Sequence, residues 1–186
     1  MGRAPEALVA AAAAPDVPAR SARLAGDRQV LIRSAGAADL AGIVDFFERS
    51  SAASRYLRFF SPQPRMRRAM VEQVAVPGAD RVTVLAQPVE FRATARHVVA
   101  VGGWVYIPRE DRCEISVAVA DAWQQLMLET YVALVLLQAA VGCGQSRFSA
   151  EVPSSDARML EFLSELGAPM RSRQEAGVVR LEFELP

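Results

Sequence analysis

The stretch Cys113–Thr130, with the sequence CEISVAVADAWQQLMLET, decides the fold of this chain. Its first half belongs to a run of small and β-branched residues, Arg112–Ala120, which predicts a strand. From Gln124 to about Ala140 the residues leave almost no polar face at helical spacing, which predicts a helix that is buried or lies in an interface. The stretch therefore predicts a strand that leads through a short turn into a helix.

The remaining patterns, taken outward from this unit, predict an α/β domain whose first half is largely antiparallel. The paired glycines Gly102 and Gly103 lie inside an expected strand, which indicates a bulge or a close backbone approach. Strands are expected at Gln29–Arg33, Arg81–Ala86, His97–Ile107, Arg147–Val152 and Val178–Leu185, and helices at Ala37–Ser50, Arg65–Val76 and Asp156–Leu166.

The composition favours one globular domain. Hydrophobic residues make up 52% of the 186 residues, which is enough for a sizeable core. We expect residues 1–28, rich in Ala and Pro, to form a disordered tail, and residues 29–186 to form a single domain. No run reaches the roughly 18 to 20 apolar residues of a membrane span. The expected location is therefore the cytoplasm, with no membrane partner.

Charge, cysteine and histidine contents argue against several classes of function. The 21 basic residues balance the 21 acidic ones, so nothing indicates a nucleic-acid partner. The two cysteines, Cys113 and Cys143, have neither metal-ligand nor disulfide spacing. A single histidine, His97, argues against a metal site and against a Ser/His/Asp triad.

Three stretches carry a resemblance to a known family: SAASRYLRFFSP at Ser51–Pro62, CEISVAVADAWQQ at Cys113–Gln125, and MLEFLSELGAP at Met159–Pro169. Together they resemble the GNAT superfamily of N-acetyltransferases, and most of all its bacterial Pat-like branch of protein-lysine acetyltransferases. The resemblance implies the GNAT fold, a mixed and mostly antiparallel sheet with a splayed central strand pair and flanking helices. It also implies transfer of an acyl group from acetyl-CoA to a primary amine, with protein lysine as one candidate acceptor.

The resemblance also implies where acetyl-CoA would bind. In the family, backbone N–H groups of the loop and helix N-terminus hold the pyrophosphate, and glycine permits the close approach. The family pattern Gln/Arg-x-x-Gly-x-Gly/Ala aligns with Gln124–Glu129, so Met127 and Glu129 replace the two small residues. The implied cofactor residues are Val117, Val119, Gln124, Gln125, Leu126, Met127, Leu128, Glu129, Thr130 and Asp156.

Both replacements oppose cofactor binding. Met127 adds a large side chain, and Glu129 adds a carboxylate that would repel pyrophosphate by about 3 to 4 kcal/mol at an effective dielectric of about 20. Asp156 takes the place of an Asn that the family often carries near CoA, which adds a second acid. The pyrophosphate loop is therefore predicted to be degenerate.

The catalytic residue implied by the resemblance is Glu114, as general base for the amine. The alternative is a strand glutamate that faces an edge or forms a salt bridge. Alternation places Glu114, Ser116 and Ala118 on one face of the strand. Tyr131 or Tyr106 could protonate the leaving thiolate, although both are also ordinary packing positions.

The acceptor is expected to meet the loop that carries Arg55, Tyr56 and Arg58, whose alternative role is to anchor that loop. Three functions stay open: an N-acyltransferase, a catalytically degenerate module that binds or regulates a protein partner, and a pocket for another small ligand. The apolar helix after Gln124 also allows a homodimer, because its first turn could pack on a partner subunit.

Overall fold

The computed structural model describes residues 15, 17–51, 78, 80–90, 97–124, 126–166 and 170–185. Within them, eight strands form one sheet in the order β1-β2-β3-β4-β5-β6-β8-β7. Each described strand pair is antiparallel except β5 with β6, which is parallel. The strands are β1 (Arg20–Arg23), β2 (Gln29–Ser34), β3 (Arg81–Pro88), β4 (Ala100–Ile107), β5 (Arg112–Val119), β6 (Arg147–Pro153), β7 (Met170–Glu175) and β8 (Val178–Glu184).

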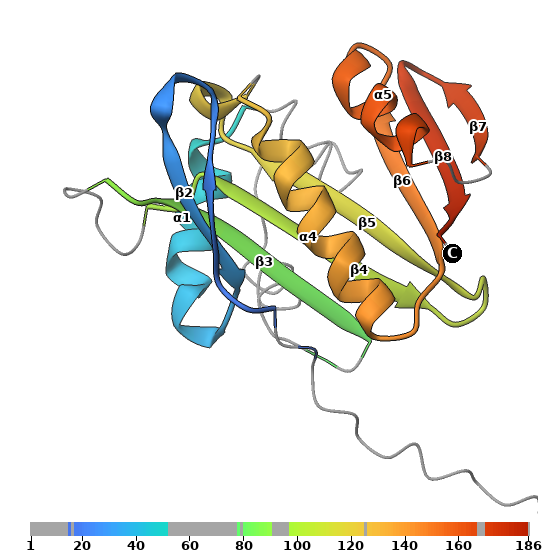
Figure 1. Ribbon diagram of the computed structural model, residues 1–186, viewed down its shortest axis with the longest axis horizontal. Helices are drawn as coiled ribbons and strands as arrows, with labels where there is room; N and C mark the ends of the chain where they lie inside the picture. Colours follow the sequence, from blue (N-terminus) through green and yellow to red (C-terminus); the bar gives the residue numbers. More distant parts are fainter. Residues whose placement is uncertain are drawn as a thin grey trace, which may run out of the picture.

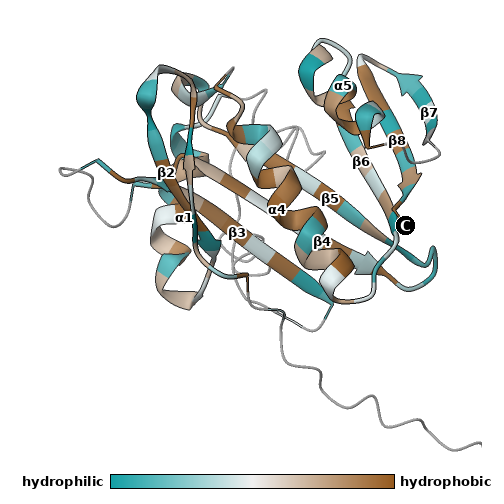
Figure 2. Ribbon diagram, in the orientation of Figure 1, coloured by the Kyte–Doolittle hydropathy of each residue, from teal (hydrophilic) through white to brown (hydrophobic). Residues whose placement is uncertain are grey.

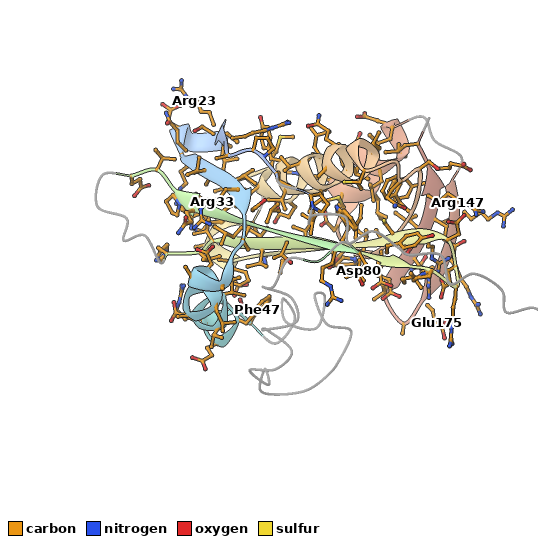
Figure 3. All side chains as sticks on the ribbon, turned by 90° about the horizontal axis from the view of Figure 1, so that it is seen from below. Arg23, Arg33, Phe47, Asp80, Arg147 and Glu175 are labelled. Carbon is orange, nitrogen blue, oxygen red and sulfur yellow. The ribbon has the colours of Figure 1, made fainter. Side chains whose placement is uncertain are left out.

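Helices cover both faces of the sheet. The helices α4 (Leu128–Gly142) and α5 (Ala157–Glu165) lie on one face, and α1 (Leu40–Arg49) lies on the other (Figure 1, Figure 3). Short 3-10 turns, Ala25–Asp27, Ala37–Asp39 and Asp121–Trp123, lead into β2, α1 and the loop before α4. The expected mixed α/β architecture is confirmed.

The core has two parts because the sheet has two covered faces. The larger cluster packs α4 and α5 on the sheet and includes Trp104 and Leu136. The smaller one packs Ile43, Phe46 and Phe47 of α1 on the opposite face. Hydrophobic colour runs along much of α4 in Figure 2, which agrees with the nearly all-round apolar pattern of its sequence.

The close approach predicted at the paired glycines is confirmed at Gly102, which lies directly under α4. Because Gly102 gives β4 no side chain at this point, α4 can pack closely on the sheet next to the central part of β5. Among the described helices, none is both long enough and apolar enough to cross a membrane.

Three expectations about the elements were wrong or incomplete. Arg20–Arg23, placed in a disordered tail by the sequence, form β1 and pair with β2. The helix expected from Gln124 begins at Leu128, because Met127 adopts a left-handed backbone conformation that no helix can contain. The strand β7 was not predicted. The helix expected at Arg65–Val76 lies outside the described residues.

Candidate functional site

The central feature of the site is a gap between two parallel strands. β5 and β6 pair through Cys113–Phe148, Glu114–Ser149 and Ile115–Ala150, and no further. Beyond these pairs β5 runs on to Val119 and β6 to Pro153 without joining. A cavity of about 500 Å³ opens where they separate, lined by both strands together with α4 and α5.

Unpaired backbone groups of β5 face this gap. The N–H of Ala120 donates to the oxygen of Val99, so Ala120 points its backbone toward the β4 side. Successive residues of a strand point their N–H and C=O groups to opposite sides. Val117 therefore points its backbone toward β6, at a position where pairing with β6 has ended. Such groups can bind an extended ligand as a neighbouring strand would.

The loop before α4 is held from both ends. Arg28 donates from Nη1 to the oxygen of Ala122 at 3.1 Å, and its guanidinium lies 4.8 Å from the ring centroid of Trp123. The side chain of Gln124 turns back and donates from Nε2 to the oxygen of Val119 at 3.3 Å. These contacts hold the loop in place and so fix the position at which α4 begins, at the mouth of the cavity.

Met127 is the last residue before α4, with φ 66° and ψ 14°. That conformation is the one glycine adopts without strain, and it costs an ordinary residue about 1 to 2 kcal/mol. Met127 therefore holds a backbone conformation that favours glycine, although its own side chain is large. The side chain of Met127 is 52% exposed and lines the cavity mouth.

Glu129 brings a negative charge to the N-terminus of α4. Its half-buried carboxylate lines the cavity. Burial raises the pKa of this carboxyl above its usual value, and the nearby Asp156 carboxylate raises it further, against the opposing effects of its own backbone N–H and of Arg158. A carboxylate therefore lies at the helix end where an anionic ligand would need free N–H groups.

Asp156 stands at the N-terminus of the other helix at the cavity. Its Oδ1 accepts from the N–H of Met159 at 3.1 Å, so it caps α5. It lines the cavity together with Glu129, Glu151 and Asp121, whereas Arg158 is the basic residue among the lining side chains. The described part of the cavity is therefore acidic.

Comparisons with known proteins agree with this geometry. No family model matches the sequence, and no curated protein matches it. Among solved structures, the GNAT domain of S. lividans PAT is 26% identical, covers 90% of this chain and 97% of its own, and superposes with a TM-score of 0.75. The chain has the GNAT fold. The predicted fold class is thereby confirmed.

Two more distant GNAT-fold neighbours show the fold alone. A putative acetyltransferase, yncA of Salmonella typhimurium, solved with its cofactor acetyl-CoA, is 20% identical over 83% of this chain and 91% of its own, with a TM-score of 0.60. A cAMP-binding acyltransferase from Mycobacterium smegmatis is 21% identical over 90% of this chain, with a TM-score of 0.57. This GNAT domain spans only 47% of that longer protein.

Glu114 of the GNAT domain belongs to a row of residues that crosses four strands: Val105, Glu114, Ser149 and Glu182 are successive partners. The row lies on the face opposite α4, because the alternate residue Val117 is the partner of Gly102 under that helix. Glu114 is half-buried and forms no ion pair with another described residue. It is not a lining residue of the cavity, but Ser116, two residues further along the same face, is one.

Most of the predicted cofactor residues meet at the cavity. The side chains of Leu126 and Leu128 instead pack on the core, and Leu128 is fully buried. Gln125, Arg55, Tyr56 and Arg58 lie outside the described residues. Tyr131 and Tyr106, considered as proton donors, do not line the cavity, and Tyr106 donates to Asp111 Oδ1. The predicted residues that line the cavity are Val117, Val119, Gln124, Met127, Glu129, Thr130 and Asp156.

Sequence reasoning missed the wall that β6 and α5 contribute. Glu151 lies on β6 and Arg158 on α5, and both line the cavity. Nothing in their local patterns marks them, because they reach the site only through the separation of two strands distant in sequence. The apolar lining residues from the same side, Met159, Leu163 and Phe183, are buried.

Proposed function

We propose that this GNAT domain is an N-acyltransferase, which passes an acyl group from a thioester to a primary amine. The observation that supports this most strongly is the cavity at the separation of β5 and β6, with the unpaired backbone of Val117 along one side. A cavity of this volume is typical of small-molecule sites. The likeness to the GNAT domain of S. lividans PAT supports the same class of reaction.

The residues fit one part of acetyl-CoA and not the other. The gap offers backbone hydrogen-bonding groups and apolar walls from Ala133, Leu137 and Leu163, which suit a pantetheine arm. The α4 N-terminus, where pyrophosphate would need free N–H groups, carries Glu129 and faces Asp156. We therefore assign no step to the pyrophosphate end of the cofactor.

Glu114 is the residue we propose to accept a proton from the attacking ammonium. It lies about 7 Å along the strand from Ser116 at the cavity wall, so the transfer would pass through water. The freed amine would attack the carbonyl carbon of the thioester. The C–N bond forms, the C–S bond breaks, and the leaving thiolate takes a proton, so that atoms and charges balance.

The chain itself offers a clean assay, because all of its 21 basic residues are arginines and it contains no lysine. Label found on lysine therefore belongs to the acceptor and not to the enzyme. We would incubate the protein with a labelled acetyl thioester and lysine-containing peptides, beside Glu114→Gln. We expect the variant to lose about a hundredfold in kcat/KM, the scale of general-base catalysis.

The matched control is Glu184→Gln, a change on the exposed side of β8 that leaves the cavity untouched. Its rate should equal that of the wild type. Equal rates for Glu114→Gln and the wild type would refute the assigned base. No transfer to any amine, with folded protein, would refute the acyltransferase itself.

The second candidate is a catalytically degenerate GNAT-fold protein that binds or regulates a partner. The observation in its favour is again Glu129, which places a carboxylate at the helix end where the family binds an anion. The outer side of α4 carries exposed apolar side chains, with Tyr131, Leu134 and Val141 each more than a third exposed. Absence of transfer together with a stable complex with a second protein would favour this candidate.

A further inference from the structure

The two halves of the cavity suit different chemical groups. The inner half, between β5 and β6, has apolar walls and the unpaired backbone of Val117. The mouth, between the N-termini of α4 and α5, presents Glu129 and Asp156. An elongated ligand that enters the gap must pass its outer end between these two carboxylates.

The mouth is unsuited to a pyrophosphate group for two reasons. Glu129 and Asp156 place two carboxylates at the ends of α4 and α5, with Arg158 as the one basic side chain that lines the described cavity beside them. The side chain of Met127, which a glycine would lack, lines the cavity at the residue just before α4.

The inner half, in contrast, offers the backbone groups and the apolar walls that a pantetheine arm needs. Its two amides can pair with strand backbone, and its methylene groups suit the walls formed by Ala133, Leu137 and Leu163. Two of the acidic lining residues, Glu129 and Asp156, lie at the ends of the helices, whereas Glu151 lies on β6 and Asp121 lies in the turn before α4. Val117 lies within the gap. The cavity should therefore bind a pantetheine arm without a nucleotide diphosphate better than one that carries it.

We propose that Glu129 sets donor specificity, so that the site takes a pantetheine-type thioester that lacks the nucleotide diphosphate of CoA. The proposal rests on the acyltransferase function proposed above and specifies which acyl donor the site accepts. Such an arm occurs as a free pantetheine thioester or as a phosphopantetheine arm carried on a protein. The two sources share the arm and differ by one phosphate.

The test compares equilibrium binding of pantetheine, 4′-phosphopantetheine and CoA by calorimetry, without any catalytic readout. We expect wild type to bind pantetheine at least as tightly as CoA. In Glu129→Gln, CoA should bind at least about tenfold tighter, while pantetheine stays within about twofold. The matched control is Glu161→Gln on α5, which is exposed and outside the cavity and should change neither affinity.

Asp156→Asn provides a second variant should Glu129→Gln fail to fold, because asparagine keeps the helix cap and removes the charge. It should improve CoA binding in the same direction. Comparable binding of phosphopantetheine and pantetheine would identify the carried arm, and about tenfold weaker binding of phosphopantetheine would identify the free thioester.

Wild-type binding of CoA about tenfold tighter than pantetheine would overturn the inference and leave the acyltransferase proposal standing. An unchanged CoA affinity in both variants would overturn it as well. Failure of all three ligands to bind would overturn the inference and the proposed function together.

Discussion

Gly102 on β4 and Val132 on α4 are so close that a Cβ on the glycine would lie 2.5 Å from Cγ1 of the valine. The same Cβ would lie 3.0 Å from Cδ1 of Leu136. Both helix residues are fully buried, so neither can move toward solvent. The position of α4 over β5, and hence the place of its N-terminus at the cavity, depends on this missing side chain.

Gly102→Ala should therefore destabilise the protein. Overpacking a closed core costs about 1 to 3 kcal/mol, and the measurement is urea unfolding followed by circular dichroism. The control is Gly142→Ala at the end of α4, where a Cβ meets nothing within 4 Å. That change should be neutral or stabilise by a few tenths of a kcal/mol. Equal stability of Gly102→Ala and wild type would mean that the helix lies further from the sheet.

Met127→Gly should stabilise the protein by up to about 1 kcal/mol, because glycine relieves the left-handed strain and loses part of the gain as backbone entropy. Little packing is lost, since the side chain is 52% exposed. Met127→Ala separates the causes: it removes the side chain but keeps φ at 66°, so it should not stabilise. The measurement is the midpoint of chemical unfolding. A gain in Met127→Ala as large as in Met127→Gly would contradict the strain argument.

The strand–turn–helix unit around the cavity could be predicted because its residues carry strong local signals. β5 alternates small and β-branched residues, and α4 is apolar on nearly all of its sides after its first turn. The start of α4 could not be predicted, since Gln124–Met127 continue the apolar and polar pattern of a helix. Only the left-handed backbone of Met127 reveals the break.

β1 and β7 were missed for a different reason. Their sequences, RSAR and MRSRQE, lack both alternation and β-branched residues. They are strands because neighbours bind them: β1 pairs with β2 and Arg20 donates to Gln138 on α4, and β7 pairs with β8. The lining of the cavity shows the same limit, because Glu151 and Arg158 come together with Glu129 only in the folded chain.

Glu129→Gln should stabilise the protein at neutral pH. Burial, with the Asp156 carboxylate as a further cause, raises the folded pKa of this carboxyl above its unfolded value. The folded state therefore binds more protons than the unfolded state between the two pKa values, and wild-type stability falls as pH rises through that window. Glutamine carries no such penalty.

The measurement is the difference in melting temperature between Glu129→Gln and wild type from pH 4 to pH 8. The difference should be positive at neutral pH and shrink as pH falls below the unfolded pKa, because the wild-type carboxyl is then protonated in both states. Glu161→Gln, exposed on α5, should show no such trend. A difference that grows toward acid would mean that Glu129 is stabilised as an anion.

Asp156 serves both as the cap of α5 and as a negative charge at the mouth, and two substitutions separate these roles. Asp156→Ala loses the hydrogen bond from the Met159 N–H, which should cost about 1 kcal/mol of unfolding free energy. Asp156→Asn keeps an oxygen acceptor of nearly equal capping strength, so its stability should lie within a few tenths of a kcal/mol of wild type. Both variants remove the charge, and both should therefore bind phosphate-bearing ligands more tightly than wild type by isothermal calorimetry. Tighter binding in Asp156→Ala alone would show that loosening of α5, and not charge, controls access to the cavity.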